Sequence, residues 1–204
     1  MAGLFLTVEG GDGSGKSTQS ALLAKWLESQ GRTVMLTREP GGTDLGNEIR
    51  DIVLHRRGHI APRAEALLYA ADRAHHIATK VRPALDRGEI VLQDRYLDSS
   101  VAYQGAGRVL EPGEVRKLSL WATEGLLPDL TILLDLDESV GQDRLKDRTT
   151  YDRLEDEEQD FHARVRDGYL ALAATEPDRF LVLNATDSVE SIASAIRDRV
   201  RALL

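Results

Sequence analysis

Short apolar runs alternate with amphipathic stretches along the whole chain. The apolar runs predict strands at 4–9 (LFLTVE), 33–37 (TVMLT), 89–94 (EIVLQD), 130–136 (LTILLDL) and 179–185 (RFLVLNA). Helical spacing of apolar residues marks about 17–30, 43–55, 62–86 and a last helix that begins at Asp187 or Ser188. Near-continuous apolar strands separated by helices are typical of a parallel sheet covered on both faces. We therefore predict one α/β domain over residues 1–204.

Composition narrows the class of protein. The chain is 42% hydrophobic and 29% charged, which is typical of a globular protein, and no apolar stretch approaches the roughly 20 residues of a membrane span. The start lacks the basic region of a signal peptide. The net charge of −8 argues against nucleic acid as a partner, and the absence of cysteine excludes disulfides and thiol chemistry. We expect a cytoplasmic protein without a membrane partner.

The strongest motif follows the first predicted strand. Residues 10–17 read GGDGSGKS, which satisfies the P-loop pattern G-x-x-x-x-G-K-[ST] between a strand and a helix. Glycines let backbone N–H groups curl around phosphates, and the helix adds its positive N-terminal end. Lys16 is predicted to contact the β and γ phosphates, and Ser17 to take a place on Mg²⁺. The motif alone leaves kinase, GTPase, ATPase and motor open.

A second candidate is Asp94, at the end of the buried run VLQD. A carboxylate in this place is typical of the residue that holds the Mg²⁺ shell opposite a P-loop. A helix N-cap or an ion pair with Arg95 would equally account for an isolated aspartate. Together with the P-loop, we favour the metal role.

Four arginines are predicted to share the carboxyl edge of the sheet, where ligands bind in α/β folds. They are Arg38, Arg50, Arg73 and Arg95. The planar guanidinium fork suits phosphate oxygens, although four arginines on a solvated surface are an equally ordinary arrangement. The apolar neighbours of Arg73 argue against that second interpretation. A kinase with a phosphorylated acceptor needs such a cationic pocket, because two anions must be held close together.

The segment at 142–153 (QDRLKDRTTYDR) is rich in arginine. We predict a short mobile lid at about 142–154 that brings guanidinium groups onto the transferred phosphoryl group. Pairs of opposite charge three residues apart explain the same pattern without a lid function.

These motifs, in this order, closely resemble those of the bacterial thymidylate kinases. The resemblance is carried by VEGGDGSGKSTQ, TREPGGTDLGNEIR, LLYAADRAHH, VLQDRYLDSSVAYQGAGR, PDLTILLDL and YDRLEDE, which together span nearly the whole chain. It implies transfer of the γ-phosphoryl group of ATP to dTMP with Mg²⁺, as a step of dTTP biosynthesis. It also implies a three-layer P-loop NTPase fold with a five-stranded parallel sheet, and a homodimer.

The resemblance also implies roles for residues of the acceptor site. Asp12 matches a carboxylate near the sugar hydroxyl and the acceptor phosphate, and Arg95 matches the arginine on that phosphate. Tyr69 stands where the family usually has a phenylalanine that stacks on thymine, and Arg73 matches the arginine on a base carbonyl. The remaining substrate positions implied or predicted are Arg38, Ser100, Tyr103 and Gln104, with Tyr103 under the sugar, where it disfavours a ribose 2′-hydroxyl.

On the donor side, Arg153 matches the lid arginine that reaches the ATP phosphates, and adenine would rest between Arg144 and the loop after the last strand. The catalytic set implied is Lys16, Arg153, Asp12 and Asp94. The donor-binding residues implied are Gly10, Gly11, Asp12, Gly13, Ser14, Gly15, Lys16, Ser17, Thr18 and Arg144.

Two other functions fit part of the sequence. The first is a kinase for another nucleoside monophosphate or for a free deoxynucleoside, which would need fewer arginines on the acceptor side. The second is a silent P-loop protein or a nucleotide-controlled switch. A guanine-specific switch needs an N-K-x-D element, which the chain lacks.

Overall fold

The computed structural model describes residues 3–204 apart from 57, 109, 146–152 and 155–158. In this part of the chain, five parallel strands form one sheet in the order β2-β3-β1-β4-β5. The strands are β1 (Leu4–Gly10), β2 (Val34–Arg38), β3 (Ile90–Asp94), β4 (Leu130–Asp135) and β5 (Phe180–Asn184). The five-stranded α/β fold predicted from the sequence is confirmed.

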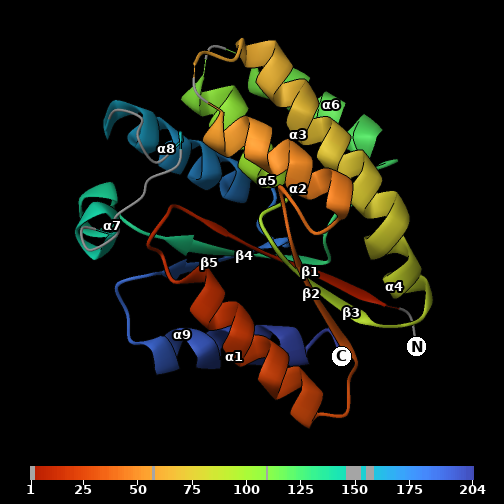
Figure 1. Ribbon diagram of the computed structural model, residues 1–204. Coiled ribbons are helices and arrows are strands. Elements are labelled where there is room, and N and C mark those ends of the chain that lie inside the picture. The colour runs from red at the N-terminus through yellow and green to blue at the C-terminus, as the bar shows by residue number, and fades with distance from the viewer. Residues whose placement is uncertain (1–2, 57, 109, 146–152, 155–158) are drawn as a thin grey trace.

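Helices cover both faces of the sheet, as Figure 1 shows. One face carries α1 (Lys16–Ser29) and α9 (Val189–Arg201). The other carries α2 (Asp44–Arg50), α3 (Pro62–His76), α4 (Arg82–Asp86), α5 (Leu97–Ser100), α6 (Pro112–Ala122) and α8 (Gln159–Thr175). The short helix α7 (Glu138–Leu145) lies at the carboxyl edge. Among the described residues, no helix combines the length and the apolar character that a membrane span requires.

The two faces of β1 meet different cores because successive strand residues point to opposite sides. Leu4, Leu6 and Val8 join a cluster with residues of α1 and α9. Phe5 packs on the opposite side, in a cluster with Tyr96 of the loop after β3. Glu9 follows Phe5 and Thr7 on that side and is fully buried. The alternation therefore carries a carboxylate into the interior beside the carboxyl end of the sheet.

Three helical segments have π-type hydrogen bonding: η1 (Asp51–His55), η2 (Ile77–Val81) and η3 (Val101–Gly107). They continue α2, α3 and α5, so the helices predicted at 43–55 and 62–86 are present but change their winding. The sequence analysis predicted no element for 97–122, where the structure has α5, η3 and α6. For α5 and η3 the reason is composition: SSVAYQGAG has small and polar residues without a clear helical apolar stripe.

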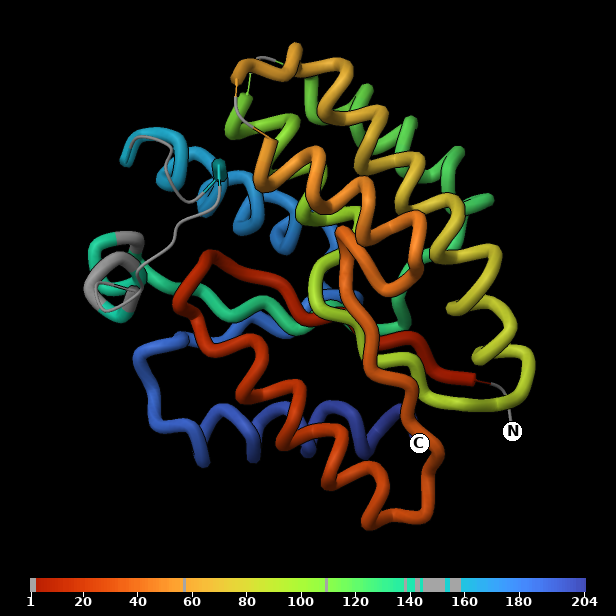
Figure 2. The backbone as a smooth tube through the Cα atoms, in the orientation of Figure 1, coloured from red at the N-terminus to blue at the C-terminus, as the bar shows by residue number. Residues whose placement is uncertain are grey.

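Strand order brings the ends of β1, β3 and β4 together. Val8 of β1 is level with Asp94 of β3, and Gly10 is level with Leu134 of β4. In the sheet, β3 lies on one side of β1 and β4 on the other, so the direction in which strands are added reverses at β1. Ligands of α/β folds bind at such a switch point. In Figure 2 the loop after β1 and the end of β4 lie at the same edge, next to α7.

Candidate active site

The loop after β1 forms a cradle that depends on its glycines. Gly10, Gly13 and Gly15 have φ values of 134°, 76° and 93°, which side-chain-bearing residues rarely adopt. At Gly10 a Cβ atom would also lie 2.4 Å from the carbonyl oxygen of Leu134. The loop leads directly into α1, whose first residue is Lys16. Backbone N–H groups and the helix N-terminus therefore face the same place, as phosphate binding requires.

Lys16 is buried and held by the loop itself. Its Nζ donates hydrogen bonds to the carbonyl oxygens of Gly10 and Gly11, at 3.1 and 2.8 Å. Burial, together with the nearby positive charge of Arg95, lowers the pKa of Lys16. An incoming phosphate would offset both causes, because it supplies negative charge beside the ammonium group.

Asp94 ends β3 next to this loop. Its Oδ1 is buried and has no hydrogen-bond partner among the described residues. The structure shows neither of the alternatives for Asp94: helix α5 is not capped by a side chain, and the ion pairs of the described residues do not include Asp94 with Arg95. Ser17, in the first turn of α1, is exposed, and Asp94 and Ser17 line the same cavity.

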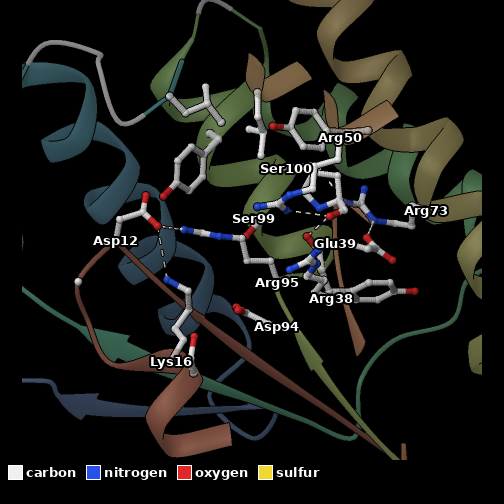
Figure 3. A pocket seen from close by; sticks show the side chains of 18 of the residues that line it. Asp12, Lys16, Arg38, Glu39, Arg50, Arg73, Asp94, Arg95, Ser99 and Ser100 are labelled. Atoms are coloured by element: carbon white, nitrogen blue, oxygen red, sulfur yellow. Dashed lines mark hydrogen bonds and ion pairs between the residues drawn. The ribbon is translucent and has the colours of Figure 1, made fainter. Parts of the chain in front are cut away.

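Arg95 joins the P-loop to the second half of the cavity. One of its nitrogens lies 2.7 Å from Oδ1 of Asp12, which is 3.8 Å from Nζ of Lys16. Burial of Asp12 would raise its pKa, but Arg95 and Lys16 together hold that pKa well below its usual value. The Arg95 guanidinium lies over the Tyr103 ring, 5.0 Å from its centroid. These contacts fix a cation at the centre of the cavity, as Figure 3 shows.

Glu9 supports Arg95 through hydrogen-bond partners that the two residues share, and the sequence analysis missed it. Its carboxylate accepts hydrogen bonds from the backbone N–H of Tyr96 at 2.7 Å, from Ser99 Oγ at 2.6 Å and from the Tyr169 hydroxyl at 2.8 Å. Ser99 and Tyr169 in turn accept from Arg95, at 3.3 and 3.4 Å. A charged residue inside an apolar strand was the available signal for this role.

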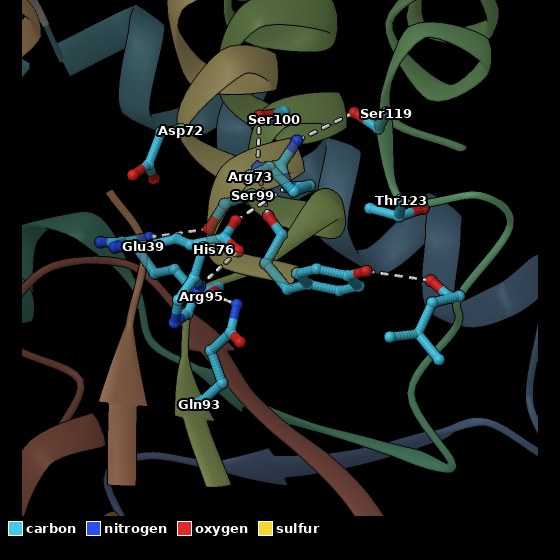
Figure 4. Close-up of polar contacts among 12 residues, drawn as sticks. Glu39, Asp72, Arg73, His76, Gln93, Arg95, Ser99, Ser100, Ser119 and Thr123 are labelled. Atoms are coloured by element: carbon cyan, nitrogen blue, oxygen red, sulfur yellow. Dashed lines mark hydrogen bonds and ion pairs between the residues drawn. The ribbon is translucent and has the colours of Figure 1, made fainter. Parts of the chain in front are cut away.

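Arg73 is buried at the far end of the cavity within a network of polar groups. Its guanidinium donates to Glu39 at 2.8 Å, to the Oγ of Ser119 and of Ser100 at 3.0 Å each, and to the Tyr96 carbonyl oxygen at 3.2 Å. Figure 4 shows this network. Sequence analysis did not identify Glu39, because the sequence near residue 39 does not indicate that its partner is an arginine 34 residues away.

His76 and Asp72 complete the network from α3. His76 lies with Nδ1 3.0 Å from Glu39 and Nε2 2.7 Å from the Thr37 hydroxyl. Burial, with the nearby charge of Glu39, raises the pKa of Asp72 to about 7. The backbone N–H of Gly41 donates to the Asp72 carboxylate. This network fixes the loop after β2 against α3.

One cavity of about 840 Å³ connects the P-loop to Arg73. It is lined by the four arginines predicted at this edge and by most of the other predicted site residues. Among them are Arg38, Arg50, Arg73, Arg95, Tyr69, Ser100, Tyr103, Gln104, Asp12, Lys16, Ser17, Thr18, Asp94 and Arg144. Figure 3 shows the arginines reaching the cavity from separate elements. Tertiary structure therefore gathers residues that lie far apart in the sequence.

Arg144 lies between the P-loop and the loop after β5. Its guanidinium donates to the carbonyl oxygens of Gly13 at 3.1 Å and Ala185 at 3.0 Å. Gly13 approaches α7 closely, because a Cβ there would lie 2.9 Å from the Gly141 carbonyl oxygen. Of the predicted lid at 142–154, the described residues include 142–145, 153 and 154 but not 146–152.

Arg153 is not among the described residues that line the cavity. Its Nε donates to the Val53 carbonyl oxygen at 3.0 Å, and its terminal nitrogen pairs with the carboxylate of Glu65. Contact with ATP phosphates would require Arg153 to leave Glu65. Its assignment as the lid arginine stays a prediction.

Known proteins resemble this chain over nearly its whole length. Residues 8–196 match the family model described as thymidylate kinase. The chain is 75% identical over 199 residues to the thymidylate kinase of Leifsonia xyli, covering 97% of this chain and 94% of the relative. It is 69% identical over 205 residues to that of Clavibacter michiganensis, covering 100% and 97%. The crystal structure of thymidylate kinase from Ehrlichia chaffeensis superimposes with a TM-score of 0.80 at 30% identity, covering all of both chains.

Proposed function

The chain belongs to the thymidylate kinase family and is an ATP-dependent dTMP kinase, and from this premise we propose how its cavity carries the reaction. The γ-phosphoryl group of ATP passes to dTMP in the cleft between the P-loop and Arg95, giving ADP and dTDP. The observation that carries this proposal is the contact of Arg95 with Asp12, at 2.7 Å. It sets the acceptor cation directly beside the donor cradle.

The donor phosphates bind in the loop of residues 10–17, with Lys16 as their main positive charge. Support comes from the left-handed glycines and from the position of Lys16 at the first turn of α1. Adenine rests against Arg144 and the loop after β5, because Arg144 already contacts Ala185 there. Ser14 of the loop and Thr18 of the first turn of α1 complete the donor site.

Ser17 and Asp94 are the residues that would hold Mg²⁺. The buried Oδ1 of Asp94, without a partner among the described residues, fits a metal-bound water or the ion itself. In the described part of the chain, no group of three acidic or histidine side chains could hold a metal alone, so the remaining ligands would be phosphate oxygens and water. When bound, Mg²⁺ offsets the charge on the transferred phosphoryl group.

The acceptor phosphate of dTMP binds to Arg95, with Arg38 beside it. Two anionic phosphates repel each other in a buried cleft, so the cations between them lower the cost of bringing them into line. Asp12 orients the Arg95 guanidinium, which leaves the remaining N–H groups to the phosphate. Arg95 is thus the group that joins both substrates.

The deoxynucleoside part of dTMP occupies the other half of the cavity. Tyr69 stacks on the base, while Arg73, Ser100 and Gln104 meet its polar edge. Tyr103 lies below the sugar, and its ring also stacks against the Arg95 guanidinium. Bulk at this point disfavours a ribose 2′-hydroxyl.

Arg153 acts during the transfer rather than before it. We assign residues 1–204 to one kinase domain with a lid at about 142–154 that supplies this arginine. Support comes from the arginine-rich sequence of the segment and from the backbone bond of Arg153 to Leu54 at the rim of the cavity. The ion pair with Glu65 holds Arg153 outside the cavity until the segment moves.

The chain acts as a homodimer in the cytoplasm. Trp121 of α6 and Leu67 of α3 are 79% and 56% exposed, and the two helices pack against each other, so a second copy of this chain would cover them. The cytoplasm is the compartment that supplies ATP, and the chain has no cysteine to form disulfides elsewhere.

An assay of ADP release with dTMP, dUMP, dCMP and thymidine as acceptors tests the proposal. We expect dTMP to give the highest kcat/KM, because the arginines need a phosphate and the base-binding end needs a thymine-like edge. Faster turnover with thymidine would contradict the acceptor site, and ATP hydrolysis unaffected by any acceptor would contradict the transfer itself.

A further inference from the structure

Glu65 is a buried carboxylate of α3 whose part in the reaction described above is limited to its ion pair with Arg153. It is 1% exposed and binds three side chains from distant segments. Its Oε1 accepts from the amide nitrogen of Gln104 at 3.1 Å and lies 3.6 Å from Nε of Arg108, while its Oε2 pairs with Arg153. Paired with two guanidinium groups, the Glu65 carboxylate accepts hydrogen bonds and offers no donor of its own.

This chemistry fixes the orientation of the Gln104 amide. The atom that faces an acceptor-only carboxylate must be the nitrogen, so the amide cannot be turned around without setting its oxygen against a negative charge. Gln104 is buried and lines the cavity together with Tyr69 and Ser100. Its carbonyl oxygen is therefore the acceptor that this side chain offers to a bound base.

Ser100, one turn earlier in the chain, offers a hydrogen-bond donor where Gln104 offers an acceptor. Its hydroxyl oxygen accepts from Arg73 at 3.0 Å, so its own hydrogen is available to donate. Ser100 and Gln104 are four residues apart on the continuous helical segment of α5 and η3, which gives their side chains neighbouring positions. The cavity thus presents a donor and an acceptor side by side at its base-binding end.

The edge of thymine is complementary to this pair. It carries an N–H at ring position 3 between two carbonyl groups, so its donor meets Gln104 and a carbonyl meets Ser100 or Arg73. Cytosine has an acceptor at position 3 and an amino donor next to it. The ring acceptor of cytosine would then face the Gln104 oxygen, and its amino group would face the donors of Ser100 or Arg73. Such pairs cannot form hydrogen bonds, which leaves buried polar groups unpaired.

We propose that Glu65 is a positioning residue for base selection: by holding the amide nitrogen of Gln104 it presents the Gln104 oxygen to the base and excludes cytosine. The inference rests on the proposed placement of dTMP in this cavity. Glu65 itself does not reach the substrate, since it acts through Gln104. A purely structural role, as an ion-pair partner of Arg108 and Arg153, predicts no effect on the choice of base.

The test is Glu65→Gln, which preserves shape but can donate as well as accept. Gln104 can then turn its nitrogen toward the base. We expect the ratio of kcat/KM for dTMP to kcat/KM for dCMP to fall about tenfold, through a higher KM for dTMP and a lower KM for dCMP. Any effect through Arg153 acts equally on both nucleotides and cancels in this ratio. Glu28→Gln, an exposed residue of α1, is the matched control and should keep the wild-type ratio.

A double-variant cycle with Gln104→Leu makes the test specific. In the Gln104→Leu background no amide remains to orient, so adding Glu65→Gln should leave the dTMP to dCMP ratio unchanged. An equal fall of the ratio with and without Gln104 would overturn the inference, and so would an unchanged ratio in the single variant. Failure of the wild-type protein to prefer dTMP over dCMP and thymidine would instead contradict the proposed function.

A measurement on the wild-type protein covers the case in which Glu65→Gln does not fold. With ¹⁵N-labelled glutamine, the Gln104 side-chain N–H groups should exchange slowly with solvent, both without nucleotide and with dTMP bound, because one of them is bonded to a buried carboxylate. Exchange at the rate of a free amide in either state would overturn the inference.

Discussion

Arg95 adopts a backbone conformation that is uncommon for its residue type. Its φ is 64°, in the left-handed region that disfavours side-chain-bearing residues. The backbone N–H of Arg95 still donates to the Val8 carbonyl oxygen at 3.0 Å, so the chain leaves the sheet in one sharp turn. That turn directs the guanidinium back to Asp12 of the P-loop. Such strained residues cluster at functional sites, where surrounding contacts hold them in place.

Arg95→Ala should remove the cation of the acceptor site. We expect KM for dTMP to rise about 100-fold, because a buried phosphate loses its guanidinium partner, while KM for ATP changes little. Steady-state kinetics with each substrate varied in turn give both values. Arg87→Ala, at an exposed position, is the control. Unchanged acceptor kinetics would refute the placement of dTMP at Arg95.

Glu9 should make stability depend on pH. Burial, followed by the nearby charge of Asp98, raises the pKa of Glu9 from 4.5 to about 7. The folded state therefore binds more protons than the unfolded state between these values. The contribution of Glu9 to stability is fully present below pH 4.5 and is lost as the pH rises through about 7.

Glu9→Gln removes this titration. From about pH 5 to about pH 8, the wild type should lose about 2 kcal/mol of unfolding free energy relative to the variant. Denaturant unfolding of both proteins across this range measures the difference. Asp72, whose pKa is also raised to about 7, is present in both proteins and cancels. A difference in stability that does not vary with pH would show that Glu9 does not titrate in this range.

At the scale of elements, η3 lines the end of the cavity where we propose that the base binds. It carries Tyr103 and Gln104 and packs closely against α8. The approach depends on Gly107, where a Cβ would lie 2.7 Å from the Phe161 ring and 2.8 Å from a Val165 methyl group. A rigid ring cannot give way as a flexible side chain would. The close approach of η3 to α8 thus requires that position 107 carries no side chain.

Gly107→Ala should therefore shift η3 away from α8. We expect a loss of about 1–3 kcal/mol of stability, as is usual for overpacking, and a higher KM for dTMP because Tyr103 and Gln104 move. Gly113→Ala on α6 is the matched control, since its Cβ would meet nothing within 4 Å. That control should be neutral or stabilising. Equal stabilities of the two variants in thermal unfolding would contradict this account.

The segment that carries Arg153 gives a prediction for catalysis. Arg153→Ala should lower kcat by about 100-fold while ATP affinity stays nearly constant, because its contact strengthens only as the phosphoryl group moves. Single-turnover kinetics and direct ATP-binding measurements separate the two effects. Equal losses of kcat and ATP affinity would indicate a ground-state contact instead.

For the whole molecule, the distribution of charge differs sharply from the net charge. The chain carries −8 overall, yet its cavity is lined by six cationic residues against three carboxylates. The cations are Lys16, Arg38, Arg50, Arg73, Arg95 and Arg144, and the carboxylates are Asp12, Glu39 and Asp94. An excess of positive charge in a cleft concentrates anionic ligands, so the cavity attracts nucleotides.

The proposed dimer is tested at this scale. Trp121→Glu should shift the protein from twice the chain mass to the chain mass in sedimentation velocity, because a charge in an apolar interface is left without a partner. Leu36→Glu is the control, since Leu36 is exposed on β2, away from α3 and α6. A monomeric wild type, or a dimer that survives Trp121→Glu, would contradict this interface.

The local sequence by itself determined the features that depend on neighbouring residues. Alternating apolar runs gave the five strands, and the glycine spacing with Lys16 gave the phosphate cradle, because backbone curvature and helix start are local properties. Arg38 at the end of β2 and Arg95 after β3 were also predictable, since parallel strands end at one edge. Ser188 caps α9 as one of the two expected residues.

Only the tertiary structure decided which partners the buried charges have. Glu9, Glu39 and Glu65 bind side chains between 34 and 160 residues away along the chain, and no local pattern records such pairs. The partner of Arg153 was likewise not visible in the sequence: the family resemblance implies a role at the ATP phosphates, but in the fold Arg153 pairs with Glu65. The physical reason is that a buried ion needs a partner, while the sequence states only that the ion is present.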